Sequence, residues 1–335
     1  MKRRERVMAV LEGRAPDHLA CMPITMMFAA DILGVKYENY ARDYRVMADA
    51  QVKTAEMFGF DHVSTIGPPA PETADLGAKV QWYEDQPPSM TEEEALFEEK
   101  SLLRRLTDGV PAFGERVDNR LRGIERLRSR VGSELLIEGW ISGPCAAAAD
   151  LRGLNRLMLD FTDDPLFVHE LFEFTLQVAI RFAAVQIEAG ADIVGIGDAA
   201  ASLVGPRLYE EFVWPREKML VDAIHARGAK ARLHICGNTR RIFDRIGGLD
   251  CDLVDVDFLV PLQHAREHVS PGRALSGNLD PVRILRSGSP ASIREALENL
   301  GKVAGTPWIV AAGCEIVRDT PRENVHALAQ FAQTH

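Results

Sequence analysis

Short apolar segments alternate with stretches of helical periodicity along almost the whole chain of 335 residues. The alternation is clearest after Pro165, where an apolar-periodic helix runs to Ala189, Gly190 ends it, and the buried segment Ala191–Gly197 follows. Strands that alternate with helices in this way form a parallel sheet with the helices packed outside it. Eight strand candidates can be counted, near residues 20, 61, 135, 192, 231, 253, 273 and 308. We therefore expect an α/β fold, a closed (β/α)8 TIM barrel that forms a single domain over residues 1–335.

Two parts of the chain are expected to lie outside the barrel proper. An N-terminal extension carries the short amphipathic helix Val7–Leu11, and Gly13 ends it. An excursion around residues 67–130 contains proline-rich segments, the half-exposed strand Ala78–Tyr83 and the basic amphipathic helix Asp118–Val131, which we interpret as a solvated face. A doubly wound open sheet is the alternative fold, but no glycine-rich nucleotide fingerprint supports it.

The charge balance disfavours two kinds of partner. The chain has 49 acidic and 39 basic residues, and its net charge of −10 argues against non-specific binding to nucleic acid or to an anionic membrane. The basic cluster Lys2–Arg6 is not followed by the apolar region of a signal peptide, and no segment reads as a membrane span. The five cysteines are scattered and do not suggest a disulfide framework. We expect a cytoplasmic protein with reduced thiols.

The segment Lys230–Asn238 carries the residues with the clearest chemistry. It predicts a short buried strand that stops at a Gly-Asn pair, with His234 and Cys236 two residues apart. Because side chains on a strand alternate between its faces, this imidazole and this thiol point to the same side. Cys314 ends another apolar run, the last predicted strand. One histidine and two cysteines suit zinc best, and three protein ligands leave a coordination position open for chemistry.

An ordinary core is the alternative interpretation of these residues, since free cysteines are often simply buried. The fold favours the metal site. In a barrel of this kind active sites lie at the C-terminal ends of the strands, and His234, Cys236 and Cys314 all lie at such ends. The other three cysteines are interpreted as structural: Cys21, Cys145 and Cys251.

Two aspartates near strand ends are candidates for supporting roles in catalysis. Asp198 ends the fourth predicted strand and Asp257 lies near the end of the sixth. Either one is placed to orient His234 or to fill the open zinc position transiently; helix capping or a place in a solvated loop is the alternative. Arg232 should face inward one layer below the ligands, with Asp255 as its candidate partner.

Three further residues are candidates for binding a large flat cofactor at the barrel mouth. Met26 and Met27 would form an apolar wall, and Asn278 would help to shape the pocket. The alternatives are that the methionines line the barrel top and that Asn278 caps the next helix. Glu315 directly follows a ligand, but neighbouring residues at a strand end usually point away, so we do not expect it to be a ligand.

Four segments together resemble a known family. His234–Thr239, Ser276–Pro281, Ala312–Val325 and Gly205–Pro215 are similar to motifs of the uroporphyrinogen decarboxylase superfamily. Within it they resemble the branch of cobalamin-dependent methyltransferases typified by methylcobalamin:coenzyme M methyltransferase. That branch binds zinc through a His-x-Cys pair and a distant cysteine, which correspond here to His234, Cys236 and Cys314.

The resemblance implies a methyl transfer. A thiol bound to zinc would attack the methyl group of a methyl-corrinoid held over the barrel mouth and yield a methyl thioether and cob(I)alamin. The cofactors implied are Zn²⁺ and methylcobalamin or another methyl-corrinoid. No corrinoid-binding signature of the Asp-x-His-x-x-Gly type is found, so a separate corrinoid protein or free methylcobalamin is the expected partner, together with a small thiol substrate.

The chain departs from the decarboxylases of the same superfamily. Those enzymes are expected to carry an arginine-rich motif after the first strand and an aspartate near the end of the second. The segment Pro23–Asp31 contains no arginine, and Ser64–Ala70 contains no carboxylate. A porphyrinogen with eight carboxylates needs several cations to hold it. Uroporphyrinogen decarboxylation is therefore disfavoured.

Two alternative functions remain open from the sequence. One is a zinc enzyme that demethylates a methylated substrate onto a corrinoid or another acceptor; the other is a barrel that binds a corrinoid or a small ligand without catalysis. The sequence does not name the thiol. Coenzyme M carries a sulfonate, which would call for a cation near the mouth, and Arg318, Arg207 and Arg42 are the unranked candidates.

Overall fold

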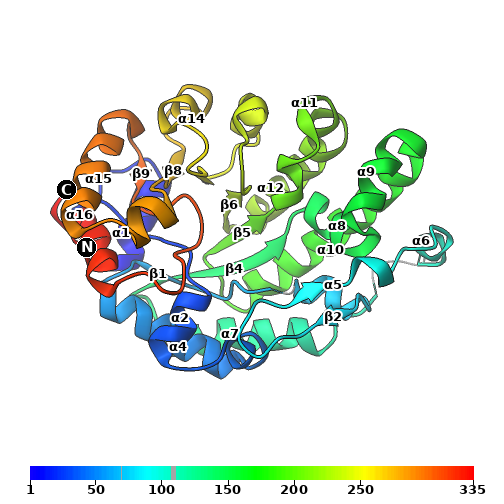
Figure 1. Cartoon of the computed structure of the whole chain (residues 1–335), viewed down its shortest axis with the longest axis horizontal. Helices are drawn as coiled ribbons and strands as arrows, with labels where there is room; N and C mark the ends of the chain where they lie inside the picture. Colours follow the sequence, from blue (N-terminus) through cyan, green and yellow to red (C-terminus); the bar gives the residue numbers. More distant parts are fainter. Residues whose placement is uncertain (69, 107–110) are drawn as a thin grey trace.

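The computed structural model describes residues 1–68, 70–106 and 111–335, so parts of the expected excursion lie outside the described residues. Seven parallel strands form one curled sheet in the order β1-β4-β5-β6-β7-β8-β9 (Figure 1). Their bounds are β1 His62–Ser64, β4 Leu136–Ser142, β5 Ile193–Gly197, β6 Lys230–His234, β7 Leu253–Asp255, β8 Ala274–Ser276 and β9 Trp308–Ile309. Each corresponds to one of the predicted strands, which confirms the α/β barrel-like fold.

The first predicted strand, near residue 20, is reduced to a single bridge between Cys21 and Val310. The amide of Met22 donates to the Val310 carbonyl at 3.1 Å, and the Cys21 carbonyl accepts from Asp61 N at 3.0 Å. This segment therefore lies between β9 and the start of β1 and joins the two edges of the sheet. The ladder stays short because the Asp61 carboxylate takes the Cys21 amide at 2.7 Å and because Pro23 has no amide hydrogen.

Helices surround the sheet on its outer side (Figure 1). The α-helices are α1 Arg3–Leu11, α2 Met27–Leu33, α3 Tyr37–Arg42, α4 Tyr44–Phe58, α5 Pro71–Asp75, α6 Ser101–Arg105, α7 Glu115–Val131, α8 Pro144–Arg152, α9 Leu154–Asp163, α10 Pro165–Glu188, α11 Gly205–Leu208, α12 Trp214–His225, α13 Phe243–Gly247, α14 Leu262–His268, α15 Pro290–Ala304 and α16 Arg322–Thr334. None of the described helices is long and apolar enough to cross a membrane.

Inward-facing side chains fill the barrel in layers. The layer at the N-terminal ends of the strands is apolar and contains Leu136, Ile193, Leu253, Ala274 and Ile309, all buried. The N-terminal extension, helix α1, packs against this layer through its own apolar face and closes that end of the barrel. The chemistry must therefore lie at the opposite end, where the strands terminate.

Outside the barrel the structure refines the sequence-based expectation in three places. The excursion contains a small separate sheet in which β2 (Val80–Gln81) pairs antiparallel with β3 (Ser89–Met90), as the alternating pattern predicted. Residues 26–43, whose sequence shows little helical periodicity, form helices α2 and α3. Between α11 and α12 the helix is interrupted by a π-turn at Tyr209–Val213, just before Pro215, whose missing amide hydrogen cannot continue the regular bonding.

One close packing contact shapes the interior next to the strand ends. Trp140 of β4 lies across Gly195 and Gly197 of β5, and a Cβ atom added at Gly195 would lie 2.1 Å from the indole ring. Both glycines leave the space that this ring occupies. Trp140 is thus fixed as a wall of the barrel interior by the sequence of the neighbouring strand.

We predict that Gly195→Ala destabilises the protein by about 1–3 kcal/mol, since the methyl group overpacks the barrel interior against the indole. Gly301→Ala is the matched control: Gly301 lies within α15, and its nearest neighbour for a new Cβ, in Trp308, is at 3.5 Å. There the same substitution should be neutral or stabilising by up to about 1 kcal/mol. Denaturant unfolding measures both, and equal effects at the two positions would contradict the packing argument.

Candidate metal centre

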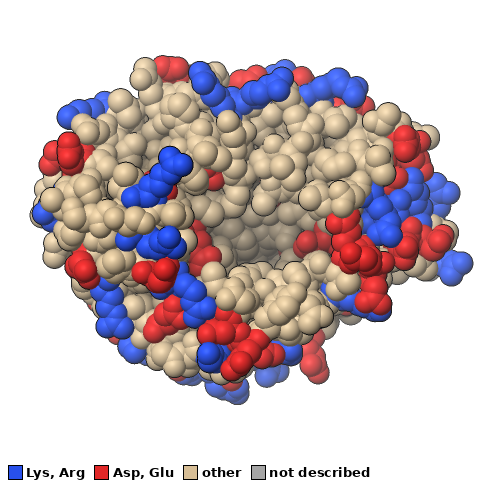
Figure 2. Space-filling view, viewed as in Figure 1, with Lys and Arg blue, Asp and Glu red and all other residues tan. Residues whose placement is uncertain are grey.

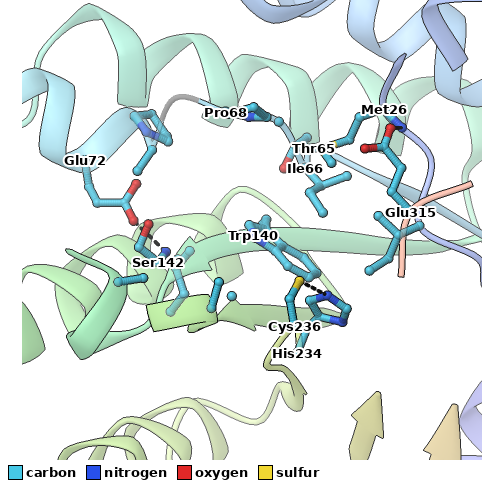
Figure 3. A pocket seen from close by; sticks show the side chains of 18 of the residues that line it. Met26, Thr65, Ile66, Pro68, Glu72, Trp140, Ser142, His234, Cys236 and Glu315 are labelled. Carbon is cyan, nitrogen blue, oxygen red and sulfur yellow. Dashed lines mark hydrogen bonds between the residues drawn. The ribbon is translucent and has the colours of Figure 1, made fainter. Parts of the chain in front are cut away.

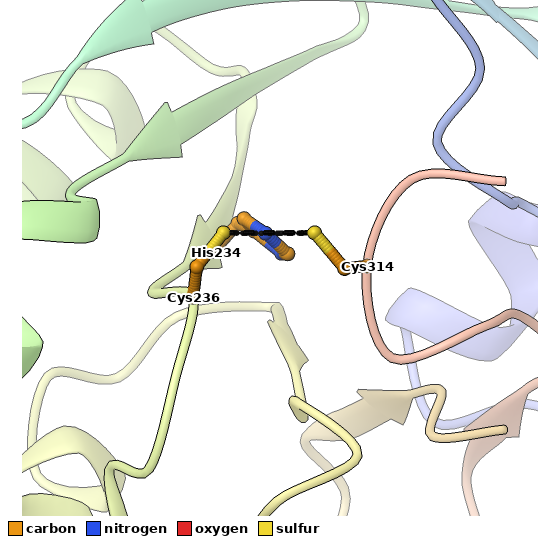
Figure 4. Close-up of side chains that lie close together, drawn as sticks. All are labelled: His234, Cys236 and Cys314. Atoms are coloured by element: carbon orange, nitrogen blue, oxygen red, sulfur yellow. Dashed lines mark hydrogen bonds between the residues drawn. The ribbon is translucent and has the colours of Figure 1, made fainter. Parts of the chain in front are cut away.

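The three predicted ligands come together at the C-terminal end of the barrel (Figure 4). His234 is the last residue of β6, Cys236 follows two residues later, and Cys314 lies in the loop after β9. Nε2 of His234 lies 2.9 Å from Sγ of Cys236 and 3.8 Å from Sγ of Cys314, and the two sulfurs are 3.6 Å apart. Residues 80 positions apart in the chain therefore offer their donor atoms to one point.

The spacing of the donor atoms suits a tetrahedral metal ion. Bond lengths of ~2.0–2.1 Å to nitrogen and ~2.3 Å to sulfur put tetrahedral ligand atoms roughly 3.5–3.8 Å apart. The two distances that involve Cys314 Sγ, 3.6 and 3.8 Å, already have this size. The distance between His234 Nε2 and Cys236 Sγ, 2.9 Å, needs a small rotation of either side chain. One nitrogen and two sulfur donors are a zinc-type set, and all three residues line the cavity described below.

Asp255 of β7 orients the histidine. Its Oδ2 lies 3.0 Å from Nδ1 of His234, on the ring side opposite the thiols. This carboxylate holds the hydrogen on Nδ1 and leaves the lone pair of Nε2 for a metal, which is the arrangement that metal-binding histidines need. Strand pairing explains the contact, because His234 and Asp255 are register partners on adjacent strands.

A buried arginine supports the same carboxylate. Nε of Arg232 lies 2.9 and 3.0 Å from the two oxygens of Asp255, and its Nη1 lies 2.9 Å from the Glu138 carboxylate. Both carboxylates are needed, since an unpaired guanidinium buried in the barrel would be costly. The prediction that Arg232 faces inward one layer below the ligands and pairs with Asp255 is confirmed.

The protons of the cluster are distributed unequally. Burial alone would lower the pKa of His234, but the hydrogen bonds to Asp255 and Cys314 outweigh it and raise this pKa to about 9. A hydrogen bond from the Cys236 thiol, followed by one from His234, lowers the pKa of Cys314 to about 4. The same contact with Cys314 raises the pKa of Cys236. The geometry thus favours a thiolate at Cys314, the form in which cysteine binds a metal.

The carboxylates of the two aspartates proposed for supporting roles bind backbone amides and not the His234 ring; their roles in catalysis remain predictions. Asp198 accepts hydrogen bonds from the amides of Cys145 and Ala146 at 3.3 and 2.6 Å, so it caps the start of α8. Asp257 accepts from Gly237 N at 2.8 Å and thereby holds the loop that follows Cys236. Asp255 contacts His234 instead. The sequence predicts Asp255 only as the partner of Arg232, because a sequence pattern does not show that one carboxylate binds two side chains.

The predicted cofactor-binding residues occupy different places. Met26 lines the cavity beside the ligands, whereas Met27 does not. The side-chain amide of Asn278 donates to the carbonyls of Val260 and Asp257 at 2.6 and 3.2 Å, so it braces the loop after β7. The carboxylate of Glu315 points toward helix α2 and accepts from the amides of Met26 and Met27 at 3.0 and 2.8 Å. Roles of Met26, Met27 and Asn278 in cofactor binding remain predictions.

A cavity of about 340 Å³ opens above the ligands. Figure 3 shows Trp140 and Cys236 on its floor, Met26 and Glu315 at one end, and Glu72 with Ser142 at the other. A space-filling view shows the hollow at the centre of this face with acidic side chains around it (Figure 2). Sequence reasoning missed four of its lining residues: Glu72, Arg120, Trp140 and Asp150. Only Trp140 carried a signal, its place near the end of a predicted strand.

The arginines considered as sulfonate partners lie elsewhere. Arg318 is held by Asp31 and Asp85, and Arg42 pairs with Glu38 and stacks on an indole ring. The Arg207 side chain is 82% exposed. None of the three lines the cavity, and Arg120 is the one cation among its described lining residues.

The chain is similar to proteins of one known family. The uroporphyrinogen decarboxylase (URO-D) family profile matches residues 2–335. A methylcobamide:CoM methyltransferase of Methanosarcina mazei is 31% identical over 225 residues, 66% of this chain and 64% of that protein, so the match spans less than two thirds of its length. A uroporphyrinogen decarboxylase of Streptomyces griseus is 32% identical over 209 residues, 61% of this chain and 56% of that protein.

The fold has a close counterpart among solved structures. A methyltransferase from Methanosarcina mazei superposes with a TM-score of 0.86 at 22% identity, over 100% of this chain and 99% of that one. At this identity the likeness shows the fold. With the profile matched over nearly its whole length, the chain belongs to the uroporphyrinogen decarboxylase family.

Proposed function

We propose that this protein is a zinc-dependent methyltransferase that moves a methyl group from a methyl-corrinoid to a small thiol. The observation that carries the proposal is the cluster of His234, Cys236 and Cys314 at the barrel mouth, whose donor atoms have zinc-like spacing and face a cavity. The methyltransferase relative supports it. When bound, zinc would hold the substrate sulfur as a thiolate at neutral pH and keep it nucleophilic, because two thiolate ligands offset the charge of the metal.

The protein groups around the cluster prepare this chemistry. Asp255 fixes the tautomer and the plane of His234, and Arg232 keeps that carboxylate ionised. Trp140, whose ring centre is 6.3 Å from that of His234, closes one side of the cavity and limits water around the sulfur. The thiol proton leaves to solvent as the sulfur binds.

The transfer itself forms one bond and breaks another. The substrate sulfur bonds to the methyl carbon while the cobalt–carbon bond breaks, and both electrons of that bond remain on cobalt, giving a methyl thioether and cob(I)alamin. The methyl donor would approach through a second, more open cavity of about 520 Å³, which shares Cys236 with the first. Leu203 at its rim is 61% exposed, which suits contact with a corrinoid protein. We place this chemistry in the cytoplasm, where the thiols stay reduced.

The cavity argues against porphyrinogen decarboxylation. Three carboxyl side chains, Glu72, Asp150 and Glu315, line it against the single cation Arg120 among its described residues. A substrate with eight carboxylates would meet repulsion there. The two alternatives kept from the sequence, demethylation of a methylated substrate and non-catalytic binding, differ from the proposal in measurable ways.

We predict about one zinc per chain in protein purified under reducing conditions, and a clear loss of zinc in Cys314→Ala. Cys251→Ala is the matched control, because Cys251 is a buried free cysteine outside the cluster and its removal should leave zinc in place. Elemental analysis provides the measurement. Zinc-free wild type, or equal loss in both variants, would remove the basis of the proposal.

We predict that Asp255→Asn weakens zinc binding by about 10–100-fold, since the amide orients the imidazole less well than a carboxylate does. Asp252→Asn is the control: Asp252 is equally buried at the other end of the same strand region, where it pairs with His225 and Lys230. Both variants should be less stable to unfolding, but only Asp255→Asn should bind zinc more weakly. Competition with a chelating dye measures it, and similar zinc affinities for the two variants would contradict the role of Asp255.

We predict that the zinc-loaded protein consumes methylcobalamin only when a thiol is present, with a methyl thioether as product. The rate should fall at least about 100-fold in Cys236→Ala, because metal activation of the sulfur contributes several kcal/mol. The absorbance change of the corrinoid and mass spectrometry of the thioether provide the measurement. Net methylation of cob(I)alamin by a methylated substrate, with no reaction of thiols, would favour the reverse-direction alternative, and no reaction at all would favour a binding protein.

A further inference from the structure

The cavity has two chemically distinct ends. Met26 and Glu315 lie at one end and Glu72 with Ser142 at the other, while His234, Cys236 and Trp140 form the floor between them (Figure 3). A substrate that places its sulfur at His234 and Cys236 has room to extend along the indole toward Glu72. The groups at that far end decide which substrates fit.

Glu72 offers an unused acceptor at the far end. It is only 1% exposed, and its Oε1 accepts a hydrogen bond from the Ser142 amide at 2.6 Å. Its Oε2 is buried and has no hydrogen-bond partner among the described residues. A buried oxygen without a donor is costly, and the deficit is relieved when a ligand supplies one.

Asp150 faces the same space from α8. Burial raises its pKa to about 7, and the charge of Glu72 adds to the rise, while a hydrogen bond from Thr73 opposes it. Burial likewise raises the pKa of Glu72. For both groups burial is the main cause, and both side chains line the same cavity with little positive charge around them.

Arg120 offsets the negative charge of Glu72 and Asp150 only partly. Its Nη1 donates to the Ala41 carbonyl and to Asn119, and its Nη2 donates to the Gly67 carbonyl at 3.3 Å. Its Nε has no hydrogen-bond partner among the described residues, and the partners of its other nitrogens are uncharged. Its field lowers the pKa of Glu72 only partly, so burial still dominates.

The metal end does not restore the balance. Bound zinc with two thiolates and a neutral imidazole would have no net charge, so it would not offset the carboxyl groups of Glu72 and Asp150 at the far end. Inside such a cavity a ligand cation is stabilised and a ligand anion is repelled. A sulfonate at the far end would face Glu72 directly.

We propose that the thiol substrate carries an ammonium group that binds between Glu72 and Asp150, so that the natural acceptor is a small aminothiol rather than a sulfonated thiol. This inference rests on the proposed function for the sulfur end of the substrate. At the far end, the ammonium supplies the hydrogen bond that Oε2 of Glu72 lacks and neutralises the paired carboxyl groups. The selectivity lies in α5 and α8, outside the metal ligands.

Three thiols with the same two-carbon chain provide the test: cysteamine with an ammonium, mercaptoethanol with a neutral hydroxyl, and mercaptoethanesulfonate, which is coenzyme M. With zinc-loaded wild-type protein and methylcobalamin we expect kcat/KM for cysteamine to exceed that for mercaptoethanesulfonate at least about tenfold, with mercaptoethanol between them. Calorimetric titration of the same three thiols without corrinoid should give the same order of affinity. Equal or better use of the sulfonate overturns the inference.

Two variants locate the selectivity. Asp150→Asn and Glu72→Gln should each reduce the ratio of cysteamine to mercaptoethanesulfonate at least about tenfold, since each removes one of the paired charges. Asp163→Asn, which removes an exposed charge at the end of α9, should leave the ratio unchanged. A ratio that is unaffected in correctly folded Asp150→Asn overturns the site, and the wild-type series decides the question if Glu72→Gln does not fold.

The same data separate the inference from the proposed function. If no thiol is methylated but cysteamine still binds most tightly, the methyl transfer is wrong and the ammonium site stands. If thiols are methylated and the sulfonate is preferred, the methyl transfer stands and the ammonium site is wrong. Absence of both binding and turnover overturns both.

Discussion

A single carboxylate, Asp255, connects the structural core of the barrel to its chemistry. One of its oxygens is shared between Nε of Arg232 and Nδ1 of His234, at 2.9 and 3.0 Å. The arginine is fully buried and needs the carboxylate for its own solvation. The imidazole needs the same carboxylate to present Nε2 to a metal. Because one carboxylate serves both side chains, His234 is held by a contact that folding itself requires, and the orientation of its ring does not depend on a metal.

Register places this connection at a defined height in the barrel. The inward residues of adjacent strands form an apolar layer at the closed end, a charged layer built from Glu138, Arg232 and Asp255, and a layer above it with His234. The middle layer separates the apolar plug from the polar mouth. Gly195 and Gly197 stand where larger side chains would fill the middle and upper layers, and the indole of Trp140 takes their space. The two glycines of β5 therefore make room for the indole that forms one wall of the cavity.

The sequence predicted the parts of the structure that depend on local patterns. Strand and helix alternation predicted seven strands with small shifts at their ends, and strand-end position predicted the three side chains that come together at the barrel mouth. The sequence-based prediction failed where contacts between distant parts of the chain determine the local structure. The strand near residue 20 shrank to one bridge because the Asp61 side chain takes an amide of its ladder. Asp198 and Asp257 fit the rule that strand-end carboxylates serve the site, yet each is occupied by backbone amides of a neighbouring segment. No spacing rule reveals which carboxylate reaches which amide.

Strand-end patterns in the sequence also do not predict the end of the cavity that contains Glu72 and Asp150, for a different reason. Its carboxyl groups come from α5 and α8, helices that no strand-end argument singles out, and their proximity to the metal cluster follows only from the folded chain. This separation has a chemical consequence. In the proposed function, the cluster of one histidine and two cysteines would bind and activate the sulfur, whereas the carboxyl groups of α5 and α8 would select the molecule that carries it. A change at Glu72 or Asp150 would then alter the field at the head group of the substrate without moving a metal ligand.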